Sequence, residues 1–135
     1  PASLDRIARE SDVISLHAPA TNATHHIVGR AFLAQVKPTA ILVNTARGAL
    51  VDETALAAAL AEGRLLAAGL DVFSPEPLRP DSPLRSLENV VLTDHAAWYS
   101  EEAIADLQRE AAEEVARVLR GEKPLNQVNK GPFPA

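Results

Sequence analysis

Four short apolar runs recur along the chain, and stretches with helical character separate them. The runs occupy residues 12–16, 40–44, 65–72 and 89–93. Their apolar residues are continuous rather than alternating, which is typical of strands covered on both faces. A succession of strand, helix and strand at this spacing predicts right-handed crossovers. The sequence therefore predicts an α/β fold with a parallel sheet and flanking helices.

Helix signals lie between and after these runs. Ser3, Asp52 and Ser100 are residue types that cap helix N-termini, and Gly63 and Gly121 are suited to the exits. The predicted helices cover residues 3–10, 30–36, 52–63 and 100–121. The last has an apolar stripe and spans about 30 Å. No strand pattern follows it, so we expect a long terminal helix and an extended, proline-containing tail.

Composition narrows the function classes. A chain of 135 residues with 47% hydrophobic and 23% charged residues is typical of one small globular domain and is too short for a two-domain enzyme. The net charge of −5 argues against a nucleic-acid or anionic-membrane surface. No apolar run would span a bilayer, and no signal-peptide pattern is visible, so we expect the cytoplasm. Because the first residue is Pro1 rather than Met, we expect that an upstream segment has been removed or was never captured.

The sequence favours no metal site. It contains no cysteine, which excludes disulfides and thiolate ligands. His25 and His26 are adjacent, but no carboxylate cluster accompanies them, so exposed loop residues are the better interpretation.

The glycines do not form a phosphate-binding turn. No two of the six glycines are spaced as in the Gly-rich turn that a dinucleotide-binding fold carries near its start. We therefore expect only part of a Rossmann-type domain, with weak or absent dinucleotide affinity in the isolated chain. The strand at residues 12–16 should then lie at an exposed edge, which invites self-association.

Polar side chains follow the predicted strands, at the edge where ligands gather in parallel sheets. Arg47 follows the second run, Asp71 and Glu76 follow the third, and His95 follows the fourth. An arginine can bind a carboxylate through two hydrogen bonds, and a histidine can exchange protons near neutral pH. A glutamate beside it would favour the imidazolium. This set fits an anionic carbonyl substrate.

Each residue also has a simpler interpretation. Arg47 fits a surface loop, Glu76 fits a turn between prolines, and His95 fits a hydrogen-bonded surface group. Asp71 fits a turn cap. His17 is expected to be structural or to face an adenosine. Trp98, with Tyr99 beside it, fits packing at the entry to the last helix.

Three segments carry a resemblance to a known family. They read SDVISLHAP at 11–19, ILVNTARGALVD at 41–52 and AGLDVFSPEP at 68–77. In this order the chain resembles the D-isomer-specific 2-hydroxyacid dehydrogenases, over nearly all of residues 3–121. The resemblance implies an NAD-dependent oxidoreductase, dimeric in full length, that interconverts a 2-oxo acid and a D-2-hydroxy acid. NADP stays open, because the resemblance implies that the segment that selects it would lie upstream of residue 1.

The resemblance also implies roles for individual residues. Arg47 would bind the substrate and border the cofactor, His95 would be the acid and base beside the nicotinamide, and Glu76 would pair with His95. The other implied cofactor-binding residues are Thr45, Ala46 and Asp71 on the nicotinamide side, Ala18, Pro19 and Thr24 on the adenosine and pyrophosphate side, and Trp98 at the pocket. Residues 1–99 would be part of a dinucleotide-binding domain, and 100–135 an interdomain helix and tail.

Within the family, residues 95–101 and 128–130 resemble the C-terminal-binding-protein branch most. The alternative functions are thus a dinucleotide-sensing, corepressor-like scaffold or an inactive fragment. One departure is Asp94, where the family often has proline. Its carboxylate either favours an imidazolium at His95 or faces solvent.

Overall fold

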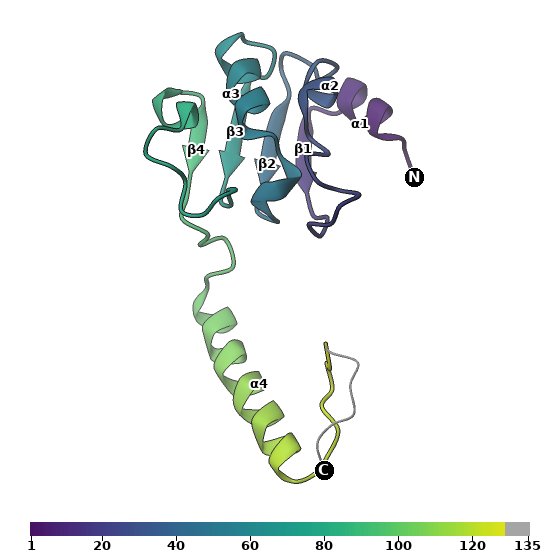
Figure 1. The fold of residues 1–135 in the computed structure, drawn as a ribbon, viewed down its shortest axis with the longest axis vertical. Helices are drawn as coiled ribbons and strands as arrows, with labels where there is room; N and C mark the ends of the chain where they lie inside the picture. Colours follow the sequence, from purple (N-terminus) through teal and green to yellow (C-terminus); the bar gives the residue numbers. More distant parts are fainter. Residues whose placement is uncertain (129–135) are drawn as a thin grey trace. The chain divides into compact units, whose positions relative to one another are not determined.

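The computed structural model describes residues 1–128, which divide into two units (Figure 1). The first is Pro1–Ala97 and contains the sheet. The second starts at Trp98 and contains one long helix. The expected domains, 1–99 and 100–135, have nearly this boundary, and their assignment to parts of a larger protein stays a prediction.

The sheet has four parallel strands, and this confirms the predicted α/β class. The strands are β1 (Val13–Leu16), β2 (Ile41–Asn44), β3 (Ala67–Leu70) and β4 (Val90–Leu92). They lie in the order β1-β2-β3-β4, so β1 is at an edge, as expected. The register aligns one residue from each strand across the sheet: Ser15, Val43, Gly69 and Val91.

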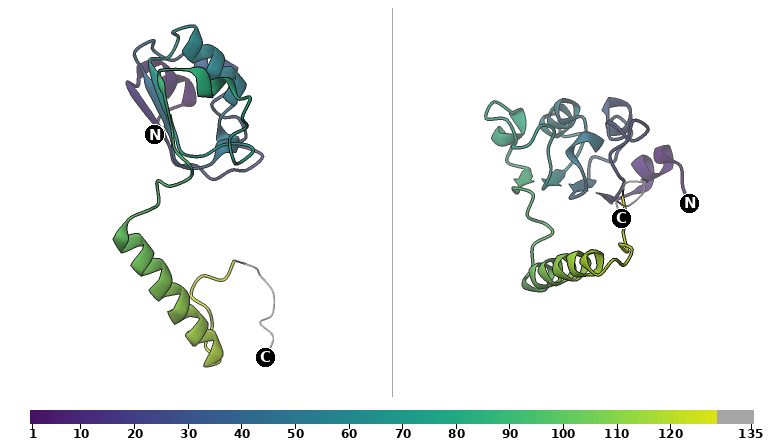
Figure 2. Two further views of the ribbon diagram at one scale, coloured as in Figure 1. Left: turned by 90° about the vertical axis from the view of Figure 1, so that its left-hand side faces the viewer. Right: turned by 60° about the horizontal axis from the view of Figure 1, so that its bottom comes forward.

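The helices of the first unit line one face of this sheet (Figure 2). The helices α1 (Leu4–Glu10), α2 (Arg30–Leu33) and α3 (Glu53–Ala61) contact one another in a row, and α3 contacts the 3-10 helix η2 (Pro83–Ser86). Strand order follows chain order, so right-handed crossovers put every connecting helix on the same side.

The expectation of strands covered on both faces is wrong for the described residues. Burial alternates along β2 and β3, and on the open face Val13 and Val91 are 61% and 68% exposed. Beneath the helices lies the core, where burial of each large aliphatic side chain stabilises the fold by about 1.5–3 kcal/mol. Its largest fully buried apolar side chains are Leu33, Leu42, Leu50, Leu56, Leu65, Leu84 and Val28.

The capping predictions are confirmed. Asp52 accepts a hydrogen bond from the Ala55 amide at 3.0 Å, and Ser3 caps α1 in the same way. Gly63, after α3, has a φ of 68°, a conformation that glycine adopts without strain. Two predicted elements are shorter in the structure: α2 ends at Leu33, before Pro38, and β3 spans only Ala67–Leu70.

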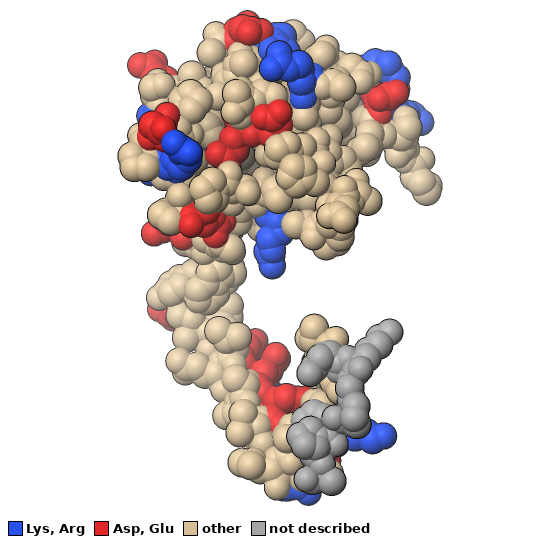
Figure 3. All heavy atoms as spheres, viewed as in Figure 1, with Lys and Arg blue, Asp and Glu red and all other residues tan. Residues whose placement is uncertain are grey.

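The second unit contains α4 (Glu101–Leu119), which is capped by Ser100. None of its residues is buried, and its surface carries ion pairs such as Arg109 with Asp106 at 2.9 Å. No helix in residues 1–128 is long and apolar enough to cross a membrane. Over the first unit, the face in Figure 3 shows acidic and basic side chains interspersed rather than gathered by sign.

Candidate active site

The carboxyl ends of the four strands share one edge of the sheet, because all the strands are parallel. Arg47 lies three residues after the end of β2, Asp71 directly follows β3, and His95 lies three residues after the end of β4. The loop after β3 then brings Glu76 to His95. The predicted convergence of an arginine, a glutamate and a histidine is therefore present in the fold.

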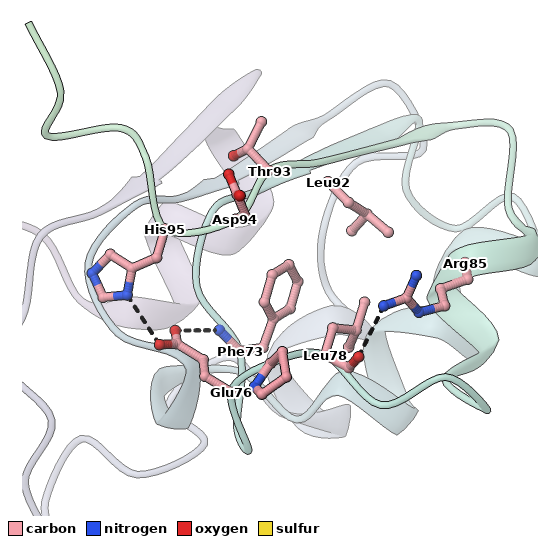
Figure 4. Close-up of a pocket in the computed structure, with 9 residues that line it drawn as sticks. Phe73, Glu76, Leu78, Arg85, Leu92, Thr93, Asp94 and His95 are labelled. Carbon is pink, nitrogen blue, oxygen red and sulfur yellow. Dashed lines mark hydrogen bonds and ion pairs between the residues drawn. The ribbon is translucent and has the colours of Figure 1, made fainter.

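Glu76 and His95 form a direct pair. The imidazole Nδ1 lies 3.0 Å from Oε2 of Glu76, and the Phe73 amide donates to the other carboxylate oxygen, also at 3.0 Å (Figure 4). The side chains of Glu76 and His95 are 39% and 45% exposed. The pair is thus oriented by the protein and still reachable from solvent.

The charge of Glu76 follows from its neighbours. The hydrogen bond from His95 lowers the pKa of the Glu76 carboxyl, and the Phe73 amide and the Arg47 guanidinium lower it further. An ionised carboxylate only accepts hydrogen bonds, so Nδ1 of His95 is the donor. The imidazole is then held in the orientation in which Nε2 is the atom for proton exchange with a substrate.

Asp71 holds the loop that carries His95. Its buried carboxylate accepts hydrogen bonds from the Thr93 hydroxyl and from the amides of Ala96 and Ala97, at 2.5, 2.8 and 2.9 Å. Burial alone would raise the pKa of Asp71, but these three bonds outweigh it and hold the pKa below its ordinary value. The Asp71 carbonyl also accepts a hydrogen bond from the His95 amide at 2.8 Å. The backbone of His95 has a φ of 60°.

Asn44 shapes the turn that presents Arg47, a role that sequence reasoning missed. Its fully buried side-chain amide donates to the Arg47 carbonyl at 2.9 Å and accepts from the Ala46 amide at 3.1 Å. The Arg47 side chain is exposed beyond this turn. The only sequence signal is an amide side chain at the end of an apolar run.

Gly48 joins the Arg47 turn to the Phe73–Glu76 loop, and this role was also missed. A Cβ atom on Gly48 would lie 2.0 Å from the Phe73 carbonyl carbon and oxygen. Only glycine therefore lets these two backbones approach. That approach places the Arg47 turn beside the loop that ends in Glu76.

The residues expected at the cofactor in the loops after β1 and β2 lie at the same edge of the sheet. Thr45 is exposed and Ala46 half-buried in the turn after β2. After β1, Ala18 is half-buried, and the Thr24 hydroxyl donates to the Pro19 carbonyl at 2.6 Å, which closes that loop on itself. Their cofactor roles stay predictions, as do those of Asp71 and of Trp98, which belongs to the second unit.

The remaining histidines do not form a metal centre. His17 lies 2.8 Å from the Ser15 hydroxyl, and the rings of His25 and His26 stack at 3.9 Å. Within residues 1–128, no three His, Cys, Asp or Glu side chains are grouped to hold a metal ion.

Comparison with known proteins identifies the family. The sequence model of the family described as "D-isomer specific 2-hydroxyacid dehydrogenase, NAD binding domain" matches residues 1–97. The chain belongs to this family. The resemblance found in the sequence is thereby confirmed at the family level.

Individual relatives of this dehydrogenase-family chain agree. Glyoxylate reductase of Korarchaeum cryptofilum is 50% identical over 127 residues, which are 94% of this chain and 38% of that protein. The TT0316 protein of Thermus thermophilus superposes with a TM-score of 0.89 at 45% identity, over 95% of this chain and 41% of that one. D-lactate dehydrogenase of Lactobacillus jensenii, solved with NAD+, gives a TM-score of 0.86 at 30% identity, over 96% of this chain and 43% of that one.

The chain spans about two fifths of the length of these relatives. It includes the carboxyl edge that holds Arg47, Glu76 and His95. The architecture expected from the sequence, a Rossmann-type parallel sheet with flanking helices and a long C-terminal helix, agrees with these neighbours.

Proposed function

We propose that the protein is a nicotinamide-dependent oxidoreductase that interconverts a small 2-oxo acid and its D-2-hydroxy acid. One observation carries the proposal: a Glu76–His95 pair at 3.0 Å, with Arg47 near enough to lower the pKa of Glu76, on the ligand-binding edge of a parallel sheet. Glyoxylate is the first substrate to test, because several relatives are named glyoxylate reductases.

The residues of this edge fit the nicotinamide end of a dinucleotide. Thr45 and Ala46 have small side chains, and their turn is accessible at the end of β2, next to β3, whose end carries Asp71. The phosphate end has no Gly-rich turn among the glycines of this chain. NAD is the proposed cofactor, with NADP the alternative, and we expect the chain alone to bind either weakly.

In the proposed reaction, the bound cofactor supplies the hydride that adds to C2 of the 2-oxo acid. Nε2 of His95 donates the proton that the substrate oxygen takes up, and the Glu76 carboxylate stabilises the imidazolium before this transfer. The Arg47 guanidinium binds the substrate carboxylate and the oxygen on which negative charge develops. In the reverse direction His95 accepts the proton as a base.

The corepressor-like alternative has no support among the relatives reported above, two of which are named as a glyoxylate reductase and a D-lactate dehydrogenase. The resemblance behind it used residues 128–130, and residues 129 and 130 lie outside the described part of the chain. Homodimerisation of the complete protein, a cytoplasmic location and the absence of a nucleic-acid partner stay predictions.

The test is a steady-state assay of NADH oxidation with a panel of 2-oxo acids. We expect turnover by the longest polypeptide that the gene encodes, and a loss of roughly 10²–10⁴-fold in turnover for His95→Ala. The matched control is His25→Ala, since that ring is exposed and stacks on the ring of His26. Near-normal turnover of His95→Ala would remove His95 from the mechanism, and no turnover with any 2-oxo acid would refute the proposed activity.

A further inference from the structure

A pocket of about 650 Å³ opens beside the Glu76–His95 pair, and Arg47 does not line it. This volume lies within the range of roughly 300–1,000 Å³ that small-molecule sites occupy. Figure 4 shows the side chains of Phe73, Leu78 and Leu92 around its centre, with Arg85 at one end and His95 at the other. The pocket is therefore apolar in the middle and charged at its ends.

Arg85 is fixed at its end of the pocket by the backbone. Its Nε donates to the Arg79 carbonyl at 3.0 Å and its Nη2 to the Leu78 carbonyl at 2.9 Å. No carboxylate among the described residues lies within ion-pair distance of it, whereas Arg79 is paired with Asp81 at 2.8 Å. The Arg85 guanidinium is thus oriented without being neutralised, which suits the binding of an anion.

The opposite end of the pocket carries negative charge. Asp94 lines it and makes no ion pair with another residue that the structure describes, and Glu76 is ionised beside His95. A ligand with a second anionic group would meet these carboxylates. The charge distribution consequently favours one anionic group, placed at Arg85.

We propose that this pocket binds a small organic monocarboxylate with an apolar body. The carboxylate would pair with Arg85, and the body would lie against Phe73, Leu78 and Leu92. Arg47, outside this pocket, is left for the oxo-acid substrate, so the two arginines serve two different anions. Because Glu76 and His95 form one wall, an occupant would contact the pair that the proposed chemistry uses.

The experiment measures binding to the 135-residue chain by calorimetry and by NMR of its four histidines, so it does not depend on the proposed activity. The probe is 3-phenylpropanoate, and 3-phenylpropanol and acetate are the controls for charge and for the apolar body. We expect saturable binding of the acid, at least about tenfold weaker binding of both controls, and a perturbation centred on His95.

Variants locate the site. Arg85→Gln should lower the affinity for 3-phenylpropanoate by about tenfold or more. Arg79→Gln removes an exposed and already paired guanidinium, so it should leave that affinity unchanged. Equal loss in both variants, equal affinity for acid and alcohol, perturbation of other histidines without His95, or no saturable binding would each overturn the proposal. The acid-to-alcohol comparison uses only the unmodified chain, so it decides the matter even if Arg85→Gln fails to fold.

Discussion

Two carboxylates at the same edge of the sheet carry the same charge in opposite surroundings. Asp71 is 3% exposed and is surrounded by donors from its own protein, whereas the Glu76 side chain is 39% exposed and faces His95. The pKa of each carboxyl is lowered. For Asp71, hydrogen bonds from the Thr93 hydroxyl and two backbone amides outweigh the effect of burial, which would raise the pKa. For Glu76, the hydrogen bond from His95 is the largest cause. The buried carboxylate builds the loop, and the exposed one is available to chemistry.

Gly48→Ala should have the largest effect, because it separates the two loops of the site while leaving the bonds of Asp71 in place. The new Cβ would overlap the Phe73 backbone, which no side-chain rotation relieves, so we expect a loss of about 3 kcal/mol in the free energy of unfolding. Urea denaturation measures it. Gly69→Ala is the matched control, since nothing lies within 4 Å of its Cβ position. Equal stability of the two variants would contradict the close approach.

Asp71→Asn should come next, at roughly 1–3 kcal/mol of destabilisation. The new amide group would place a donor opposite a backbone or hydroxyl donor that the carboxylate now satisfies. Amide exchange should also accelerate at Ala96 and Ala97. A variant as stable as the original chain would show that the buried carboxylate does not hold this loop.

Glu76→Gln should cost less than about 1 kcal/mol of stability, because its pair with His95 is partly exposed and screened. The contrast with Asp71→Asn in the same denaturation series sharpens the comparison. A larger loss for Glu76→Gln than for Asp71→Asn would reverse the roles that we assign to the two carboxylates.

Lowering the pH should reduce the contribution of both carboxylates to the free energy of unfolding. A lowered pKa in the folded state contributes stability that is fully present above the ordinary carboxyl pKa, roughly 4, and is lost as the pH falls through the folded-state value. The free energy of unfolding should therefore decline below about pH 4, and less steeply in Asp71→Asn. An unchanged slope in that variant would refute the lowered pKa of Asp71.

The sequence predicted the parts of this molecule that depend on near neighbours. The caps Asp52 and Ser100 act within three residues, and the strand ends that place Arg47 and His95 follow from hydrophobic runs and parallel order. The loop geometry could not be predicted from the sequence. Thr93 binds Asp71, which lies 22 positions away in the chain, and Gly48 packs against the backbone of Phe73 in a different loop. Such contacts leave no periodic pattern in the sequence.

The charge state of Glu76 tests most directly whether Arg47, Glu76 and His95 lie together. Its carboxyl carbon can be followed by NMR through a pH titration of the unmodified chain, His95→Gln and Arg47→Gln. We predict a pKa below the ordinary glutamate value in the unmodified chain, a clear rise in His95→Gln and a smaller rise in Arg47→Gln. An ordinary pKa that neither substitution changes would contradict the convergence of the three side chains.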